Sequence, residues 1–427
     1  MKVKQRIVVL SAAVCLALPA HAQSQWSFSH RIELRANYRD SNEESFQLRV
    51  RPPELGGSAF LATPDPGGSA ELSVAALQLE MSYGTWFAAR ARVHAVDKYR
   101  RNPTSTDRDI DAEELFIRFG EKPEVLNRPE RTSFFVQIGK APKMERQPVR
   151  LLESYGLAAT AFNRFEDTQI LVGGTVGRNL YWRLQGANGN PLFFRDSNAL
   201  AGDNGTPPLL RGEPSKLGAG FPILYNAESE SLFFDTGEVQ FGQALGYRWQ
   251  RDDGTFGFDF IAFHYDRDLA DEAVLTGTFY GGDLDLLDGA FGFSLPTTGR
   301  KKEEYGGRAY VEWHGLTAIA QFTKQNTAGL QRQGHEIEAG YRIAFAGGLL
   351  QSIQPAARLS GLSPRYRAGM FLAPSVGWPW TKIDAGIRAG FARNIDVTVE
   401  RARHNVGAPP GVKLDLTETL VTLRWRS

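Results

Sequence analysis

Hydrophobic and polar residues alternate strictly along the segment 26–39. One face is apolar apart from a histidine, and the other face is polar. The apolar face holds Trp26, Phe28, His30, Ile32, Leu34, Ala36 and Tyr38. A period of two over this length predicts a β-strand with one face against an apolar environment. The segment exceeds the roughly five or six residues of a globular strand and covers the roughly 9–11 that a tilted strand needs to cross a membrane.

The same alternation returns along the chain. It is found in the segments 46–51, 77–83, 87–95, 239–249, 308–314, 336–345, 383–391, 395–400 and 421–426. Their polar faces carry Arg, Glu and Asp, and short turns such as 84–85 and 252–254 join neighbouring segments. The fold class predicted is all-β: a transmembrane, antiparallel, up-and-down β-barrel with long extracellular loops. Closed bacterial barrels have even strand numbers, and the segments indicate about 16 strands, with 14 or 18 as alternatives.

Three stretches interrupt the alternation and predict long connections. They are residues 52–70, 141–167 and 188–230, and the second contains 148–155, for which we expect a short helix. Long loops of a barrel belong on its extracellular side, where one either folds inward to narrow the pore or only covers the rim. The residues leave both options open. The acidic side chains within 268–302 suit a solvated loop better than a cation site.

The first 22 residues have the pattern of a secretory signal peptide. Basic residues at 2, 4 and 6 precede an apolar stretch, and Ala20-His21-Ala22 gives a small-x-small cleavage site. The alternative, an uncleaved anchor helix, needs about 20 apolar residues. We therefore expect a signal peptide over 1–22, a barrel domain over 23–427 and location in the cell outer membrane.

The last strand of the predicted barrel is 421–426, with Val421, Leu423 and Trp425 on its apolar face. It is similar to the terminal assembly signal of outer-membrane barrels, which normally ends in an aromatic residue. Here Ser427 occupies that position.

Composition and charge exclude several classes of protein. The only cysteine, Cys15, lies in the predicted signal peptide, which excludes disulfides and thiolate metal sites from the mature chain. Without the three basic residues of that peptide, 46 of the 49 basic residues remain against 48 acidic ones. No polybasic block indicates nucleic acid as a partner. No cofactor or metal is expected.

The charged faces of the strands point into the predicted lumen. The pore-lining candidates are Arg31, Arg35, Arg49, Arg51, Arg90, Arg92, Lys98, Arg118, Lys140, Arg308 and Arg342. Rings of Arg or Lys in a pore favour anions. An equally weighted alternative is that these side chains pair with carboxylates and hold the wall in shape. Glu33, Glu80, Glu114, Glu312 and Glu338 are the partners in that interpretation.

Two other functions are weighed against a channel. A barrel lipid hydrolase needs a catalytic histidine, and His94 and His314 lie on polar faces, but no Gly-x-Ser-x-Gly or metal-binding spacing accompanies them. The prediction is therefore that the chain is not an enzyme. A polysaccharide-export barrel of the alginate type, or a scaffold in an envelope complex, shares an arginine-rich lumen and stays the main alternative.

The middle of the chain resembles the porin O/P-like, phosphate-selective-porin-like family. The resemblance rests on 135–142 (FVQIGKAP), 161–166 (AFNRFE) and 180–191 (LYWRLQGANGNP), with 111–119 similar to the preceding strand. It covers residues 110–192. It implies a 16-stranded homotrimeric channel in outer-membrane lipid that passes small hydrophilic solutes, often anions. The family's phosphate-site residues have no residue-by-residue match here.

Overall fold

The computed structural model describes residues 26–42, 45–47, 60–62, 67–95, 110–122, 126, 132–163, 166–189, 223–225, 239–268, 276–278, 298–365, 379–406 and 414–427. The predicted signal peptide and most of the long connections 188–230 and 268–302 lie outside these ranges. Within them, no helix is long and apolar enough to cross a membrane.

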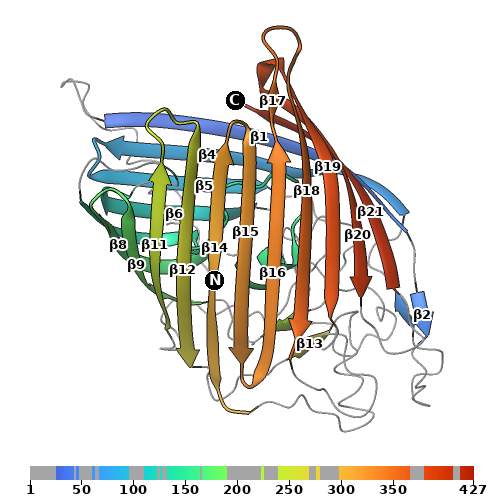
Figure 1. Ribbon diagram of the computed structural model, residues 1–427, viewed down its shortest axis with the longest axis horizontal. Coiled ribbons are helices and arrows are strands. Elements are labelled where there is room, and N and C mark those ends of the chain that lie inside the picture. Colours follow the sequence, from blue (N-terminus) through green and yellow to red (C-terminus); the bar gives the residue numbers. More distant parts are fainter. Residues whose placement is uncertain are drawn as a thin grey trace, which may run out of the picture.

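Sixteen antiparallel strands form a closed barrel, as the alternation predicts (Figure 1). They are β1 (Trp26–Ser41), β4 (Gly67–Tyr83), β5 (Phe87–Ala95), β6 (Ile110–Gly120), β7 (Ser133–Pro142), β8 (Glu166–Val176), β9 (Leu180–Ala187), β11 (Gln240–Gln250), β12 (Phe256–Asp268), β14 (Lys301–Trp313), β15 (Leu316–Thr327), β16 (Leu330–Tyr341), β18 (Leu350–Pro364), β19 (Trp380–Phe391), β20 (Ile395–Val406) and β21 (Leu414–Arg426). The two-residue β17 (Ile343–Ala344) continues β16 along the edge of β18.

The first strand closes the ring. One edge of β1 pairs with β4 and the other with β21, from Glu33 opposite Arg426 to Ser41 opposite Glu418. Ser427 extends this seam, because its backbone N–H donates to the Ile32 carbonyl at 3.0 Å and its hydroxyl accepts from the Ile32 N–H at 2.9 Å. The residue that replaces the usual terminal aromatic thus hydrogen-bonds to β1.

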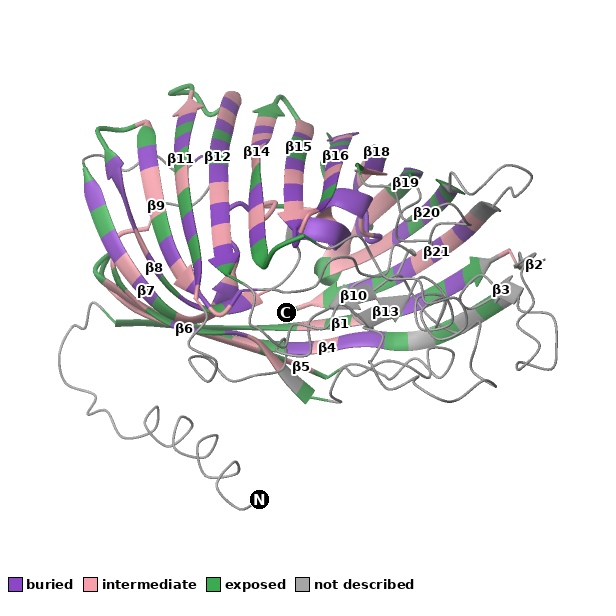
Figure 2. Cartoon of the chain, turned by 90° about the horizontal axis from the view of Figure 1, so that it is seen from below, coloured by how far each residue is buried: buried purple, intermediate pink, exposed green. Residues whose placement is uncertain are grey.

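Side chains alternate between the two faces of the barrel wall, as the banding along the strands shows (Figure 2). On β1, Phe28 is 57 % exposed, whereas Asn37 and Arg39 on the opposite face are 6 % and 2 % exposed. Apolar exposed faces and polar buried faces are the reverse of a soluble protein. They fit a wall with lipid outside and a charged interior.

Short turns and aromatic side chains gather at the same end of the barrel. Trp26 packs edge-on against Tyr83 at 4.9 Å between ring centroids, and Tyr83 packs against Trp86 at 5.6 Å. Phe87 and Phe119 continue this row at 5.6 Å. Amphipathic rings collect where hydrocarbon meets water, so this row forms an aromatic girdle.

The structure corrects one predicted strand. The segment 46–51 does not supply the second strand of the barrel, which is β4. Residues Ser45–Gln47 form the short strand β2, which pairs only with β3 (Phe60–Ala62), and the rest of 46–51 lies outside the described residues. The alternation there is short and meets Pro52 and Pro53, which donate no ladder hydrogen bond. A second small ribbon pairs β10 (Ile223–Tyr225) with β13 (Thr276–Thr278).

Candidate functional site

The connection between β7 and β8 folds into the barrel. Residues 143–163 run along the inner wall, and their helical turn lies inside the ring (Figure 2). This turn is Ala159–Asn163, whereas the short helix was predicted over 148–155. Pro148 has no N–H to donate, and the N–H groups of the following residues bond to carboxylates of the wall instead of to the chain's own carbonyls. We call residues 143–163 the inner loop.

Wall carboxylates hold the inner loop by its backbone. A carboxylate oxygen of Glu338 accepts from the N–H groups of Leu151 and Leu152 at 2.6 and 3.0 Å. Glu400 accepts from the N–H groups of Glu153 and Ser154. Each carboxylate thus accepts from two neighbouring N–H groups, so four consecutive residues are fixed in place.

Arg and Lys side chains of the wall donate hydrogen bonds to backbone carbonyl groups of the inner loop. Arg358 donates to the Ser154 carbonyl at 2.9 Å, and Lys382 donates to the Tyr155 carbonyl at 2.6 Å. Arg358 also pairs with Asp384 at 3.0 Å. These charges are almost fully buried, and each has an opposite charge beside it, as burial of a charge requires.

Glycines of the same wall make room for the loop. A Cβ on Gly340 would lie 3.2 Å from a methyl group of Leu151, and one on Gly386 would lie 3.0 Å from a methyl group of Leu152. Both leucines are buried. We call β16, β18, β19 and β20 the loop-bearing wall, because its glycines, carboxylates and cations all serve the contact with the inner loop.

A cavity of about 860 Å³ remains between the inner loop and the rest of the barrel. Its charged lining is strongly unequal in sign. The basic members are Arg35, Arg90, Arg92, Arg118, Lys122, Lys143, Arg146, Arg150, Arg183, Arg308, Arg358, Arg388, Arg424 and Arg426; the acidic members are Glu33, Glu113, Glu114 and Glu312. A chain close to electroneutrality therefore concentrates positive charge around this space.

Strands β5 and β6 form the part of the lining that we call the open wall. Arg90 lies 2.7 Å from Glu80 and 3.2 Å from Glu114, and Arg92 lies 2.6 Å from Glu113. The side chains of Arg90 and Arg92 are still 35 % and 24 % exposed. They are paired and also reach the cavity.

Both interpretations of the lumen arginines have counterparts in the structure. Arg35 pairs with Glu33 at 2.6 Å, as the pairing interpretation expects, and Glu338 pairs with Arg358 at 3.5 Å. Arg308 instead pairs with Asp259 at 2.5 Å. Glu312 accepts a hydrogen bond from Tyr310. Structural ion pairs and a basic lining thus coexist on the same side chains.

Ten of the eleven predicted pore-lining residues separate into three groups. Arg35, Arg90, Arg92, Arg118 and Arg308 line the cavity. Arg31 and Arg342 are exposed and lie away from it, toward the end of the barrel with the short turns. Arg49, Arg51 and Lys98 lie outside the described residues.

Lys140 departs from its predicted place. It pairs in register with Leu115, which is 54 % exposed on the outer face, and it does not line the cavity. Inward positions of β7 are odd-numbered, from Ser133 to Gln137, so Lys140 has the parity of the outer face. The side chain predicted to point into the lumen therefore lies on the outer side of the wall.

Several lining cations were not among the predicted ones. Arg388 and Arg424 lie on polar faces of segments that the alternation identifies, so a systematic count of those faces would have found them. Arg146 and Arg150 belong to the inner loop, where no period-two pattern exists. Only the folded structure brings them to the cavity.

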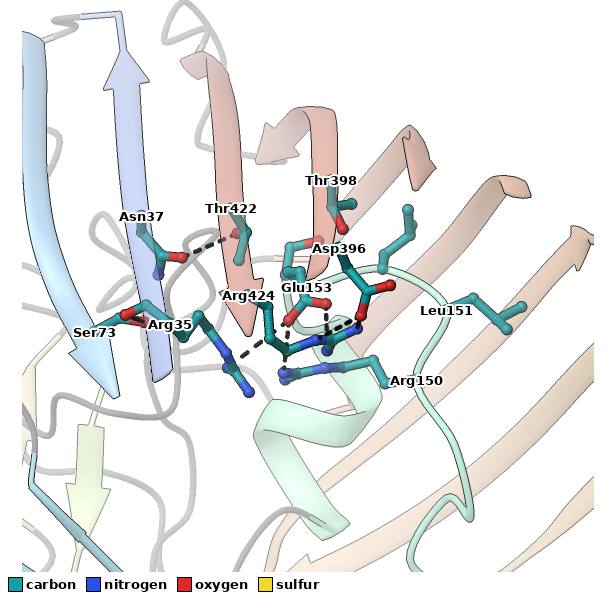
Figure 3. Close-up of polar contacts among 12 residues, drawn as sticks. Arg35, Asn37, Ser73, Arg150, Leu151, Glu153, Asp396, Thr398, Thr422 and Arg424 are labelled. Carbon is teal, nitrogen blue, oxygen red and sulfur yellow. Dashed lines mark hydrogen bonds and ion pairs between the residues drawn. The ribbon is translucent and has the colours of Figure 1, made fainter. Parts of the chain in front are cut away.

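One carboxylate of the inner loop, that of Glu153, lies close to four of these cations, three of which Figure 3 labels: Arg35, Arg150 and Arg424. Glu153 lies 2.7 Å from Arg388, 2.8 Å from Arg424, 3.7 Å from Arg150 and 3.8 Å from Arg35. Burial by itself would raise the pKa of Glu153, but the positive charges of the arginines outweigh it and lower the pKa below its usual range. Glu153 therefore stays ionised, and we call these five residues the Glu153 cluster.

Among the described residues, no three His, Asp or Glu side chains are placed together to hold a metal ion. His94 lies inside the barrel, with Nδ1 at 3.7 Å from Glu113, and lines the cavity.

Comparison with known proteins places this geometry in a known fold. No protein-family model and no curated protein sequence matches the chain. The outer membrane channel DcaP of Acinetobacter baumannii is similar in structure, with a TM-score of 0.52 and 7 % identity over 94 % of this chain and 97 % of that chain. The chain has the porin fold. Salmonella typhi OmpF is also similar, with a TM-score of 0.50 and 10 % identity over 94 % of this chain and 97 % of that one. At such identities the likeness concerns the fold alone.

Proposed function

We propose that this porin-fold chain is a channel for passive diffusion of small hydrophilic solutes across the bacterial outer membrane, with a preference for anions of the phosphate type. The observation that carries the proposal is the cavity lining, with fourteen Arg and Lys side chains against four Glu. Guanidinium groups stay charged at any physiological pH and bind oxyanions through paired donors. A pore lined in this way attracts anions and repels cations.

Several expectations from the sequence are part of this proposal. They are cleavage after Ala22, outer-membrane lipid around the apolar face, assembly as a homotrimer and kinship with the O/P-like porins. The exposed apolar side chains of the wall support the lipid environment. The remaining three rest on the sequence patterns described above.

The inner loop argues against polysaccharide export. A polymer needs a continuous wide path, whereas residues 151–155 are bonded to the loop-bearing wall through their backbone. His94, one of the two histidines considered for a lipid hydrolase, lies in the lumen beside Glu113 and away from the lipid-facing surface. Diffusion of small solutes suits a cavity of about 860 Å³ better than either alternative.

Liposome swelling tests the proposal. Liposomes that hold the refolded protein should swell in small neutral sugars and faster in a small carboxylate than in an amine of the same size. Equal swelling in the carboxylate and the amine would remove the anion preference. No swelling in any solute, with the barrel shown to be folded, would remove the channel.

A further inference from the structure

The Glu153 cluster belongs to a larger network with more positive than negative charge. Arg424 also pairs with Asp396 at 2.9 Å, and Arg426 pairs with Asp396 at 3.2 Å. Arg35 completes the network through Glu33 at 2.6 Å. Five guanidinium groups thus share three carboxylates, Glu153, Asp396 and Glu33. The network has a formal excess of two positive charges.

The arginines of this network face the cavity. All five arginines of the network line the cavity, whereas Glu153 and Asp396 do not. The side chain of Glu153 is only 3 % exposed, and those of Arg150 and Arg388 are 22 % and 16 % exposed. A solute in the cavity therefore encounters five guanidinium groups and Glu33, with the carboxylate of Glu153 buried behind the arginines.

The contacts of Glu153 show that this group of arginines can bind a carboxylate. A carboxylate fixed on the inner loop takes bonds from Arg388 and Arg424, which come from the two wall strands β19 and β21. Arg150 is held beside them, with its guanidinium 4.1 Å above the ring of Tyr155. The carboxylate is supplied by the chain, so it is a permanent ligand of the arginines.

We infer that the cavity side of the Glu153 cluster is a binding subsite for a small oxyanion, and that Glu153 sets its strength by competing for the same arginines. The inference rests on the proposed anion channel and names the site at which an anion pauses. Glu153 neutralises part of the cluster, so a solute is held weakly enough to leave, as conduction requires. Removal of the Glu153 charge should turn the subsite into a tighter anion site.

The test measures block of chloride current by inorganic phosphate, with acetate as a second oxyanion, in planar bilayers. Glu153→Gln keeps the shape and size of the side chain and removes its charge. Phosphate should then block at lower concentration than in the wild type. Arg388→Gln should weaken block, and the double variant should return toward the wild-type value, because the two changes cancel in charge.

Glu312→Gln is the matched control, since it removes a negative charge from the same cavity outside the cluster. It should leave the phosphate concentration for half-block unchanged. Equal tightening by Glu312→Gln and Glu153→Gln would show a general field and overturn the subsite. A larger conductance without tighter block in Glu153→Gln would show that Glu153 only positions the loop, and would also overturn it.

Failure of the proposed function gives a different result. A wild-type channel without anion preference, in which Glu153→Gln still creates phosphate block that Arg388→Gln abolishes, would refute the anion channel and keep the subsite. An anion-selective wild type whose block does not respond to either variant would do the reverse. If phosphate and acetate block equally, the subsite recognises small oxyanions in general. Block by phosphate alone would show that the subsite is specific for phosphate.

Discussion

The loop-bearing wall and the open wall use the same sequence pattern for different purposes. On the loop-bearing wall, Glu338, Arg358, Lys382 and Asp384 are almost completely buried under the inner loop. On the open wall, 35 % of the side-chain surface of Arg90 is exposed. Alternation places a charge inside the barrel in both cases. The inner loop covers the charges of the loop-bearing wall, which therefore stabilise the fold. The charges of the open wall are not covered in this way and can contact a solute.

We expect the largest effect from removing the carboxylates that accept hydrogen bonds from the inner loop. Glu338→Ala combined with Glu400→Ala leaves four backbone N–H groups of residues 151–154 without their acceptors. Each donor that stays buried should lower the free energy of unfolding by ~1–3 kcal/mol. We expect the inner loop to detach from the wall, with lower thermal stability and higher single-channel conductance. Glu303→Ala is the control, since the Glu303 side chain is 45 % exposed and contacts His264 instead of the loop. Unchanged conductance in the double variant would show that the loop is held by other contacts.

A matched pair of arginine substitutions compares the two walls directly. Arg358→Met leaves Glu338 and Asp384 short of a buried cation and should cost about 3–5 kcal/mol of unfolding free energy. Arg90→Met removes a half-exposed partner and should cost only ~0–1 kcal/mol. Denaturant unfolding in detergent measures both. Equal losses would mean that burial by the inner loop adds nothing to the pairs beneath it.

A glycine substitution tests the close approach of the loop. Gly386→Leu inserts a side chain where Leu152 and Glu400 lie, and overpacking of this kind costs about 1–3 kcal/mol. Ala385→Leu, on the exposed outer face of the same strand, is the control and should be close to neutral. A neutral Gly386→Leu would place the loop farther from the wall than the structure does.

On the open wall the expected effect is on selectivity. Arg90→Ala with Arg92→Ala removes two cations near the solute path, each worth about 1 kcal/mol at ~4 Å in water. Anion preference should fall by several-fold in reversal-potential measurements. Arg31→Ala with Arg401→Ala is the control, because both side chains are exposed and neither lines the cavity. Equal changes in selectivity for both pairs would show that Arg90 and Arg92 have no special effect on the solute path.

The smallest effect concerns pH. The pKa of Glu153 is lower in the folded protein than its ordinary value of 4.5, so its stabilising charge is present above 4.5 and is lost only as the pH falls through the lower folded value. The difference in chloride selectivity between wild type and Glu153→Gln should therefore stay constant from neutral pH down to 4.5. Chloride is the probe here because phosphate changes its own charge within this range. Loss of that difference before pH 4.5 would contradict an ionised Glu153.

The barrel wall was predictable from the sequence because period two is a local property. On β1 the alternation from Trp26 to Arg39 assigned each residue to the correct face, and the even strand number followed from closure of the ring. Residues 46–47, predicted as part of a barrel strand, belong to the short ribbon of β2 and β3, since three alternating pairs carry too little information to separate the two structures.

The solute pathway was predictable only in part. Arg90 and Arg92 follow from strand parity, whereas Lys140, which was predicted in the lumen, has the parity of the outer face of β7. The inner loop has no period, and its course depends on contacts between residues far apart in sequence, such as Leu151 with Glu338. The Glu153 cluster draws its arginines from β1, β19, β21 and the loop, which no local pattern connects.

The reversal potential of the wild-type channel in a potassium chloride gradient shows whether the basic lining selects anions. A basic cavity lining predicts the sign of a chloride-selective pore, with the preference reduced at high salt as the arginines are screened. A potential of the opposite sign, which shows that potassium passes more readily, would contradict the account.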